Sequence, residues 1–242
     1  MIPRLHVITD DHILGWDNFI PRALGIMERG GGELVFHLRG PRTGGRALYA
    51  LAAALKGPAR TFGSVLLVND RVDLALALQL PGAHLGQRSL PPEVAREILG
   101  PGCLLGLSVH SAEEAEEGVG RGAGEGHGRT AGEGAGQAAK GEAARTAEGG
   151  AGGAVDFLLV GTVFSSPSHP EGVPGGVGRI REVLRVCSLP LLSIGGISHA
   201  RVGEVMASGA HGVAVRGGIW DAMDPWAAIE VYLEELVKGR RR

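Results

Sequence analysis

Several polar side chains of this sequence directly follow short apolar runs, a position from which they could bind and transform a small molecule. Arginine, amide and hydroxyl groups donate hydrogen bonds, and histidine is a base that titrates near neutral pH. Two histidines, His37 before Arg39 and His169 in the hydroxyl-rich stretch 165–169, are candidates for moving a proton. We predict that six further residues bind a substrate, namely Arg39, Asn69, Ser108, His110, Ser166 and Ser168.

Two glycine pairs, Gly195-Gly196 and Gly217-Gly218, follow two later apolar runs. Glycine lets backbone N–H groups approach an anion closely, and the start of a helix favours negative charge. Either pair alone is a weak sign, because glycine also serves many turns. Together with Arg216, the two pairs predict a site for the phosphate group of a ligand.

Eight short runs rich in leucine and β-branched residues precede these side chains and position them. Most runs are apolar at consecutive positions, as in strands covered on both faces, and helical segments separate them. This alternation predicts an α/β fold, a single (β/α)8 TIM barrel over residues 1–242, with an open doubly wound sheet as the alternative. In a barrel, the glycine pairs follow strands seven and eight, the usual place of a phosphate site. The predicted strands are 5–9, 34–38, 65–69, 82–85, 104–108, 157–161, 191–194 and 212–215, and the clearest helices are 46–55, 71–80, 91–99, 199–208 and 224–238.

Residues 118–153 break this pattern, because Gly, Ala, Glu and Arg dominate them and Val119 is their one large apolar residue. Such a stretch buries too little apolar surface to offset the entropy of ordering it. We predict a flexible glycine-rich insertion between helix 5 and strand 6, at the barrel end opposite the polar side chains. A tolerated insertion is favoured over a docking segment, because long loops cost little closure entropy.

The composition restricts the predicted partners to small molecules. The 24 Lys and Arg residues nearly balance the 26 Asp and Glu residues, so no basic face is predicted for nucleic acid or an anionic membrane. No run approaches the roughly 18 apolar residues of a membrane span, and the amino terminus lacks a signal-peptide pattern. Cys103 and Cys187 adjoin apolar runs and are expected to be free thiols in a reducing cytoplasm. The sequence leaves the oligomeric state open and is compatible with a homo-oligomer.

Eight short motifs, in order, resemble the thiamine phosphate synthase/TenI superfamily over nearly the whole chain except the insertion. The resemblance implies a TIM-barrel enzyme of thiamine biosynthesis that binds a thiazole phosphate. Synthases of this superfamily couple a hydroxymethylpyrimidine pyrophosphate to that thiazole phosphate, whereas TenI-type enzymes isomerise a carboxylated thiazole phosphate by moving a proton. The motifs are Val7-Ile8-Thr9-Asp10, His37-Leu38-Arg39, Val68-Asn69-Asp70, Leu85-Gly86-Gln87, Ser108-Val109-His110-Ser111, Gly161-Thr162-Val163-Phe164, Ile194-Gly195-Gly196-Ile197 and Gly212-Val213-Ala214-Val215.

The pyrophosphate-binding part of the synthase pattern is only partly kept. The resemblance implies a glutamine, an arginine and a lysine after strand two, where this chain has His37, Arg39 and Pro41. Arg42 or Arg46 would then have to supply the missing cation, although an arginine fork is not equivalent to a lysine.

The metal-binding and proton-transfer residues also depart from the family. Asp70 matches one of two magnesium-binding aspartates of the synthases, although it could equally cap a helix, and Ser89 replaces the other. TenI-type tautomerases carry a histidine where this chain has Thr162, so that His169 or His37 would have to carry the proton.

We therefore expect a TenI-like protein that binds thiazole phosphate and tautomerises carboxythiazole phosphate without a cofactor. The alternative is a magnesium-dependent thiamine phosphate synthase that also binds the pyrimidine pyrophosphate. A third hypothesis is a non-catalytic thiazole phosphate carrier or regulator, which binding without turnover would reveal. A general phosphosugar isomerase fits less well, because it does not explain the Asn69-Asp70 and Ser108-His110 matches.

Overall fold

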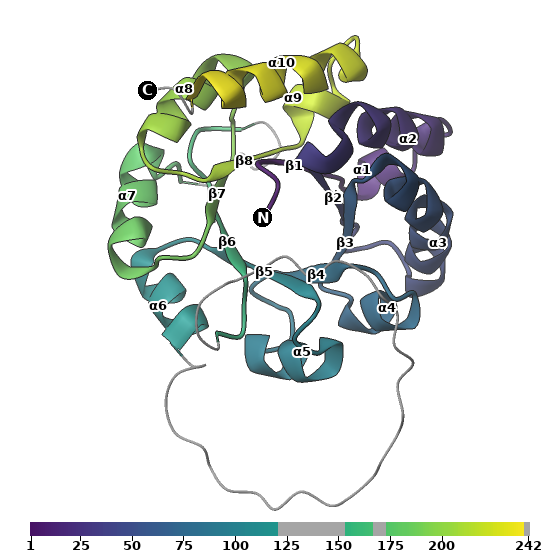
Figure 1. The fold of residues 1–242 in the computed structure, drawn as a ribbon, viewed down its shortest axis with the longest axis horizontal. Helices are drawn as coiled ribbons and strands as arrows, with labels where there is room; N and C mark the ends of the chain where they lie inside the picture. The colour runs from purple at the N-terminus through teal and green to yellow at the C-terminus, as the bar shows by residue number, and fades with distance from the viewer. Residues whose placement is uncertain (121–152, 167–172, 240–242) are drawn as a thin grey trace, which may run out of the picture.

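Eight parallel strands form a closed barrel in the computed structural model of the chain, which describes residues 1–120, 153–166 and 173–239 (Figure 1). Each strand pairs with the next along the chain, and the last pairs with the first. This closure confirms the predicted TIM barrel and excludes the open doubly wound sheet. The strands are β1 (Leu5–Ile8), β2 (Leu34–Leu38), β3 (Val65–Asn69), β4 (Gly82–Leu85), β5 (Leu104–Val109), β6 (Phe157–Val160), β7 (Leu191–Ile194) and β8 (Gly212–Val215).

Helices connect the strands and form the outer layer of the barrel (Figure 1). The helix predicted at 46–55 continues to Phe62, where Gly63 ends it with a positive φ of 79°. The last helix begins after Asp224, whose side chain accepts hydrogen bonds from two N–H groups of the first turn. The helices are α1 (Asp11–Leu14), α2 (Phe19–Gly30), η1 (Gly31–Glu33), α3 (Gly45–Phe62), α4 (Val72–Ala77), α5 (Pro92–Leu99), α6 (Ala112–Gly120), α7 (Gly176–Val186), η2 (His199–Arg201), α8 (Val202–Ala207), α9 (Gly217–Trp220) and α10 (Pro225–Lys238).

Successive side chains of each strand point to opposite faces of the barrel wall. On β2, Leu34, Phe36 and Leu38 belong to the large core between the strands and the helices. Val35 belongs instead to a small apolar cluster inside the barrel, together with Phe157 of β6. Because both faces are buried, the strands have apolar residues at consecutive positions.

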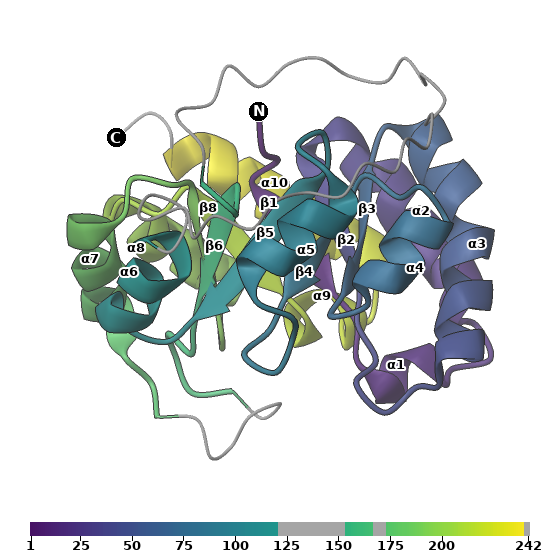
Figure 2. The same ribbon diagram turned by 90° about the horizontal axis from the view of Figure 1, so that it is seen from below.

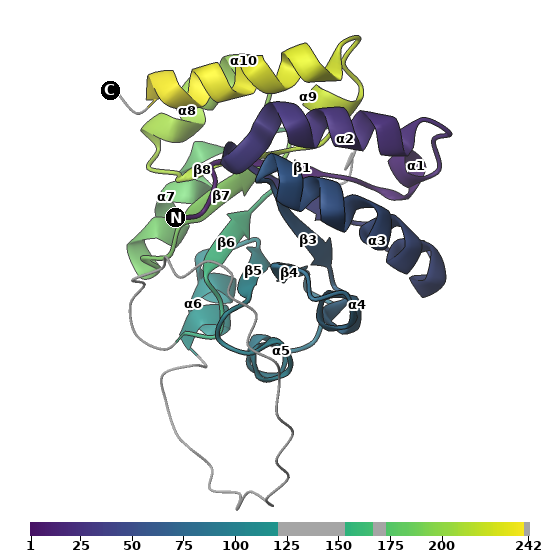
Figure 3. The same ribbon diagram turned by 45° about the vertical axis from the view of Figure 1, so that its right-hand side comes forward.

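The two ends of the barrel carry different structures. Figure 2 shows the short helices α1 and α9 at one end and the amino terminus at the other. Since α1 follows β1 and α9 follows β8, the carboxyl ends of the strands lie on the side of these helices. At the other end, Arg4 donates hydrogen bonds to the carbonyl oxygens of His211 (2.9 Å) and Leu236 (2.8 Å), which ties the amino terminus to α10. Figure 3 shows α2 between α3 and α10, so the last helix of the chain packs against the first long helix.

Some sequence predictions concern features outside the barrel wall. No helix of the described ranges is long and apolar enough to cross a membrane. Cys103 and Cys187 are free thiols, as predicted. Of the predicted insertion, residues 121–152 lie outside the described part of the chain, and residues 118–120 belong to the end of α6.

Candidate active site

A cavity of about 770 Å³ lies at the carboxyl ends of the strands. Ser168 and His169 lie outside the described residues, and His37 does not line the cavity. Arg39 and Arg216, which are far apart in the sequence, both line it. The predicted site residues that line the cavity are Arg39, Asn69, Asp70, Ser108, His110, Ser166, Gly195, Gly196, Arg216, Gly217 and Gly218.

Asp70 is held at the end of β3 by the loop that follows β4. Its Oδ1 accepts hydrogen bonds from the Gly86 N–H (2.9 Å) and from the Ser89 hydroxyl. Its positive φ of 64° is a conformation that aspartate tolerates better than most residues. No side chain caps α4, so Asp70 does not have the alternative capping role. Its Oδ2 has no hydrogen-bond partner among the described residues and remains available to a ligand.

Three arginines line the cavity, and they differ in their partners. Arg216 donates from Nε to Asp10 Oδ2 at 2.7 Å, and its Nη1 lies 3.8 Å from Asp221 Oδ2. The guanidinium groups of Arg39 and Arg88 have neither a carboxylate nor another hydrogen-bond acceptor within the described ranges. A guanidinium without a counter-ion is well suited to bind a phosphate in a bidentate manner.

The structure corrects the expected source of the missing cation. Arg42 donates from Nε to Asp11 at 3.3 Å with a side chain that is 86% exposed, and neither it nor Arg46 lines the cavity. Arg88, in the loop after β4, lines the cavity instead. Sequence reasoning assigned no role to Arg88. It also assigned none to Asp10, although the position of Asp10 just past β1 was a usable signal.

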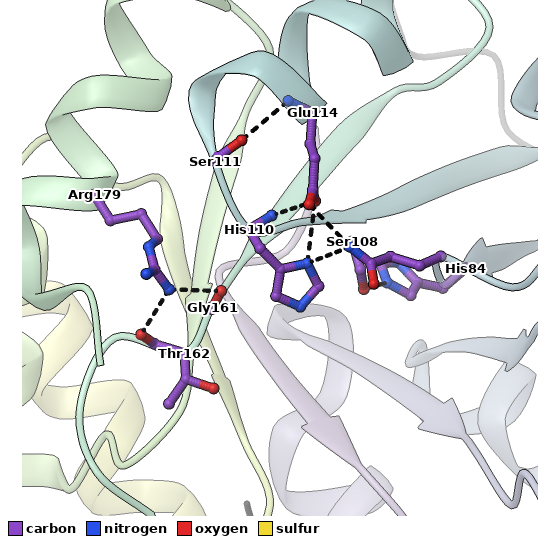
Figure 4. Close-up of polar contacts among 9 residues, drawn as sticks. His84, Ser108, His110, Ser111, Glu114, Gly161, Thr162 and Arg179 are labelled. Atoms are coloured by element: carbon purple, nitrogen blue, oxygen red, sulfur yellow. Dashed lines mark hydrogen bonds and ion pairs between the residues drawn. The ribbon is translucent and has the colours of Figure 1, made fainter. Parts of the chain in front are cut away.

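His110 lies on the rim of the cavity in a network with Glu114 (Figure 4). Glu114 Oε2 accepts a hydrogen bond from the His110 N–H (2.7 Å) and lies 3.1 Å from His110 Nδ1, while Oε1 accepts from Gln87 Nε2 (3.0 Å). Burial acts to raise the pKa of Glu114, but the hydrogen bonds from His110 and Gln87 outweigh it and hold the pKa below its usual value. Among the histidines of the described ranges, His110 alone lines the cavity.

Arg179 of α7 fixes the backbone where β6 opens into the cavity (Figure 4). Its Nη1 donates hydrogen bonds to the carbonyl oxygens of Gly161 and Thr162, both at 3.2 Å. Thr162, Ser165 and Ser166 of this stretch line the cavity. Arg179 therefore positions the hydroxyl-rich stretch, a role that sequence reasoning missed because α7 follows the cavity-lining motif.

The glycine pair after β7 packs against this same stretch. Gly195 and Gly196 have positive φ values of 104° and 61°. A Cβ on Gly195 would lie 2.6 Å from Thr162 Cγ2, and one on Gly196 would lie 2.3 Å from the Ser165 carbonyl oxygen. The backbone conformation and the close packing therefore require glycine at both positions, independently of the phosphate-binding role that the sequence predicted.

The second glycine pair makes room for a tyrosine of α10. A Cβ on Gly218 would lie 2.2 Å from Tyr232 Oη. The Tyr232 hydroxyl donates to the Ile197 carbonyl oxygen at 2.9 Å, and burial raises its pKa to about 12. Tyr232 thus ties the loop after β7 to α10, next to the start of α9.

Three fully buried histidines, His6, His37 and His84, occupy the barrel interior. His37 Nδ1 lies 3.1 Å from Asn69 Oδ1 and His37 Nε2 lies 2.9 Å from His6 Nδ1, while His84 Nε2 lies 2.8 Å from Ser108 Oγ. Burial lowers the pKa of His37 to about 4 and that of His84 well below its usual value. His37 was expected to move a proton at the cavity mouth, but its position is different: it contacts Asn69 from the barrel interior.

A closed barrel with a polar cavity at the carboxyl ends of its strands defines the class of TIM-barrel enzymes, whose active sites lie at this end. The family model described as thiamine monophosphate synthase matches residues 5–124 and 133–219. The chain therefore belongs to this family, TMP-TENI, in agreement with the resemblance of its sequence motifs.

Similar proteins cover most of the chain. The thiamine-phosphate synthase of Roseiflexus castenholzii is 35% identical over 93% of this chain and 84% of its own, and that of Desulfitobacterium hafniense strain Y51 is 33% identical over 93% and 92%. The solved structure of a thiamine phosphate pyrophosphorylase from Pyrococcus furiosus is 25% identical, with a TM-score of 0.74 over 98% of this chain and 96% of its own. These names favour the synthase, which the sequence analysis ranked second, and they do not support the expected tautomerase.

Proposed function

We propose that the protein is a thiamine phosphate synthase, which joins a hydroxymethylpyrimidine pyrophosphate to a thiazole phosphate. One observation carries the proposal: a single cavity holds Asp70, with a free carboxylate oxygen, and Arg39 and Arg88, which have no acidic partner among the described residues. A pyrophosphate leaving group needs cations and a metal ion to balance its charge. A tautomerisation releases no such anion.

The donor set fits a magnesium ion that binds together with its phosphate ligand. The described residues contain no group of three His, Cys, Asp or Glu side chains that could hold a metal by themselves. Magnesium usually takes one or two carboxylates, several waters and substrate phosphate oxygens, so Asp70 would hold it beside the Ser89 hydroxyl. When bound, the ion would neutralise charge on the departing pyrophosphate.

The two substrates would occupy different parts of the cavity. Arg39 and Arg88 would bind the pyrophosphate, and Asn69 and Ser108 would bind the pyrimidine. The thiazole phosphate would bind at the two glycine pairs and Arg216, which Asp10 orients through its 2.7 Å ion pair. Ser166 would donate a hydrogen bond to a ligand, and for Ser168 and His169 the substrate-binding and proton-transfer roles stay predictions from the sequence.

The coupling requires no general base. The C–O bond between the pyrimidine methylene and the pyrophosphate breaks, and the lone pair of the thiazole nitrogen forms the new C–N bond. The thiazole ring becomes a cation and loses no proton. This chemistry suits a cavity in which the described lining offers one histidine, His110, and places it on the rim.

One assay distinguishes the hypotheses. Purified protein is incubated with both substrates, with and without magnesium, and thiamine phosphate is measured by chromatography. We expect magnesium-dependent product and a loss on the order of 100-fold in Asp70→Asn, the scale of lost metal binding. Asp73→Asn is the matched control, because Asp73 is 62% exposed and pairs with Arg71. Metal-independent isomerisation of carboxythiazole phosphate without coupling would instead establish a tautomerase, and thiazole phosphate binding without turnover a carrier.

A further inference from the structure

A chain of buried hydrogen-bonding groups runs through the barrel interior and ends at the cavity. The Pro3 carbonyl oxygen lies 3.2 Å from His6 Nε2, His6 Nδ1 lies 2.9 Å from His37 Nε2, and His37 Nδ1 lies 3.1 Å from the Asn69 amide. Both imidazoles are fully buried, and Asn69 is 8% exposed and lines the cavity. These three side chains have no other hydrogen-bond partner in the described part of the chain.

The number of protons on His6 and His37 determines which group donates in each of these hydrogen bonds. Burial lowers the pKa of His37 to about 4 and that of His6 well below its usual value, so each ring is neutral at pH 7 and carries one proton. The Pro3 carbonyl can only accept, so it takes the proton on His6 Nε2. His6 Nδ1 is then bare and accepts the proton on His37 Nε2, which leaves His37 Nδ1 without a proton.

A bare His37 Nδ1 needs a donor, and the Asn69 amide can supply one. The two ends of an amide have the same shape, so either the oxygen or the NH2 group fits the space at 3.1 Å from this nitrogen. With NH2 toward His37, all three contacts are hydrogen bonds. With oxygen toward His37, the bare His6 Nε2 would face the Pro3 carbonyl, an arrangement of two acceptors that buried groups avoid.

We propose that His6 and His37 are positioning residues that turn the carbonyl oxygen of Asn69 toward the cavity. The cavity then offers a hydrogen-bond acceptor at this point and selects a ligand group that donates. The identity of that ligand rests on the proposed function: a pyrimidine with an amino group donates here, whereas its oxo counterpart does not. The glutamine that the synthase pattern implies at position 37 can donate or accept and imposes no such direction.

Nuclear magnetic resonance of the free protein, labelled with 15N-histidine, tests the proposal without any substrate. A failure of this proposal is therefore distinguishable from a failure of the proposed function. Two-bond couplings between ring protons and nitrogens show which nitrogen is protonated, and the signals are assigned among the nine histidines with His6→Phe and His37→Gln. We expect a proton on Nε2 of both His6 and His37 at pH 7. Protons on Nδ1 of both rings, or a doubly protonated ring, would overturn the proposal.

The His6→Phe variant tests the link to Asn69, because it keeps an aromatic ring and removes the bond to Pro3. In this variant no group accepts the proton on His37 Nε2, and the tautomer of His37 is no longer fixed by the Pro3 carbonyl, so both orientations of the Asn69 amide become accessible. By calorimetry, the wild type should bind hydroxymethylpyrimidine about tenfold more tightly than its 4-oxo analogue, the scale of one buried hydrogen bond, and the variant should lose this preference. An unchanged preference in the variant would overturn the role of His6 and His37 in orienting Asn69.

Discussion

Two arginines of the cavity are well suited to bind a polyanion. Arg39 follows β2 and Arg88 lies after β4, and neither guanidinium meets a carboxylate in the described residues. We predict that Arg88→Met raises the KM for the pyrimidine pyrophosphate about tenfold or more, because a charged hydrogen bond is lost, and leaves the KM for thiazole phosphate nearly unchanged. Arg42→Met is the matched control, since Arg42 pairs with Asp11 outside the cavity. Equal KM values for the pyrophosphate in Arg88→Met and wild type would place that group elsewhere.

The buried histidines make stability depend on pH. His37 has a pKa of about 4 in the folded chain and about 6.5 when unfolded, so between these values the unfolded state binds more protons. The free energy of unfolding should therefore fall as pH decreases from 6.5 to 4, by roughly 3 kcal/mol from His37 alone. In urea unfolding at several pH values, His37→Gln should reduce the slope of the free energy of unfolding against pH. His12→Gln is the control, because it makes the same substitution at an exposed histidine. The same slope in His37→Gln as in wild type would contradict the prediction.

Residue type and position at or just past the end of a strand were enough to predict much of the cavity lining, including Arg39, Asn69 and Ser108. The depth of His37 was not predictable. Alternation along the strand indicates that its side chain points into the barrel, but the stagger of neighbouring strands sets its distance from the barrel end. Arg88 was missed for a related reason, since its approach to the cavity depends on the path of the loop after β4. Strand-end rules thus identify candidates, and the three-dimensional path of the chain decides which of them meet.

At the scale of elements, the loops after β6 and β7 pack closely against each other at the site. Gly196 has a φ of 61°, and its Cβ would collide with the Ser165 carbonyl oxygen. We predict that Gly196→Ala lowers the free energy of unfolding by about 2 kcal/mol, because the cost of backbone strain at a positive φ adds to the cost of displacing the loop after β6. Urea unfolding measures the loss. Gly203→Ala is the matched control, because Gly203 lies in α8 with open space around its Cβ position, and it should be neutral or stabilising by up to about 1 kcal/mol.

The same variant distinguishes a packing role from a phosphate role. If Gly196 mainly shapes the loop, Gly196→Ala weakens binding of both phosphorylated and unphosphorylated thiazole. If it mainly admits the phosphate to backbone N–H groups, the phosphorylated ligand alone loses affinity. The contact with Ser165 leads us to expect the first result, and calorimetry with the two ligands checks it.

Strands were easier to predict than helices, and the reason is burial. All eight strands begin where the apolar runs predicted, because strands buried on both faces contrast sharply with polar strand ends. Helix boundaries were less certain: α3 runs to Phe62, past Pro58, because packing of Leu48, Ala52, Leu55 and Ala59 in the core outweighs the low helix propensity of proline. Short elements such as α9 have too few residues to show a helical period, and the sequence did not predict them.

At the scale of the whole molecule, the chain returns to the barrel after residues 121–152 through an anchored segment. Arg96 of α5 donates hydrogen bonds to the Ala154 carbonyl oxygen (3.0 Å) and to Asp156 Oδ2 (2.7 Å). The same carboxylate oxygen accepts a hydrogen bond from the Leu105 N–H at 2.7 Å. Residues of the barrel therefore position the start of β6. The family model leaves residues 125–132 unmatched.

Deletion of residues 125–148 tests whether the barrel is complete without them. The described end of α6 and the start of the anchored segment lie at the amino ends of the strands, opposite the cavity, and residues 121–124 and 149–152 are kept to connect them. Because loop length contributes little to closure entropy, we predict a melting temperature within about 2 °C of wild type and unchanged KM values for both substrates. Asp156→Ala in the full-length chain is the comparison, since it breaks the anchor and should cost about 2 kcal/mol. A loss of stability in the deletion as large as that of Asp156→Ala would mean that the deleted residues are part of the folded structure.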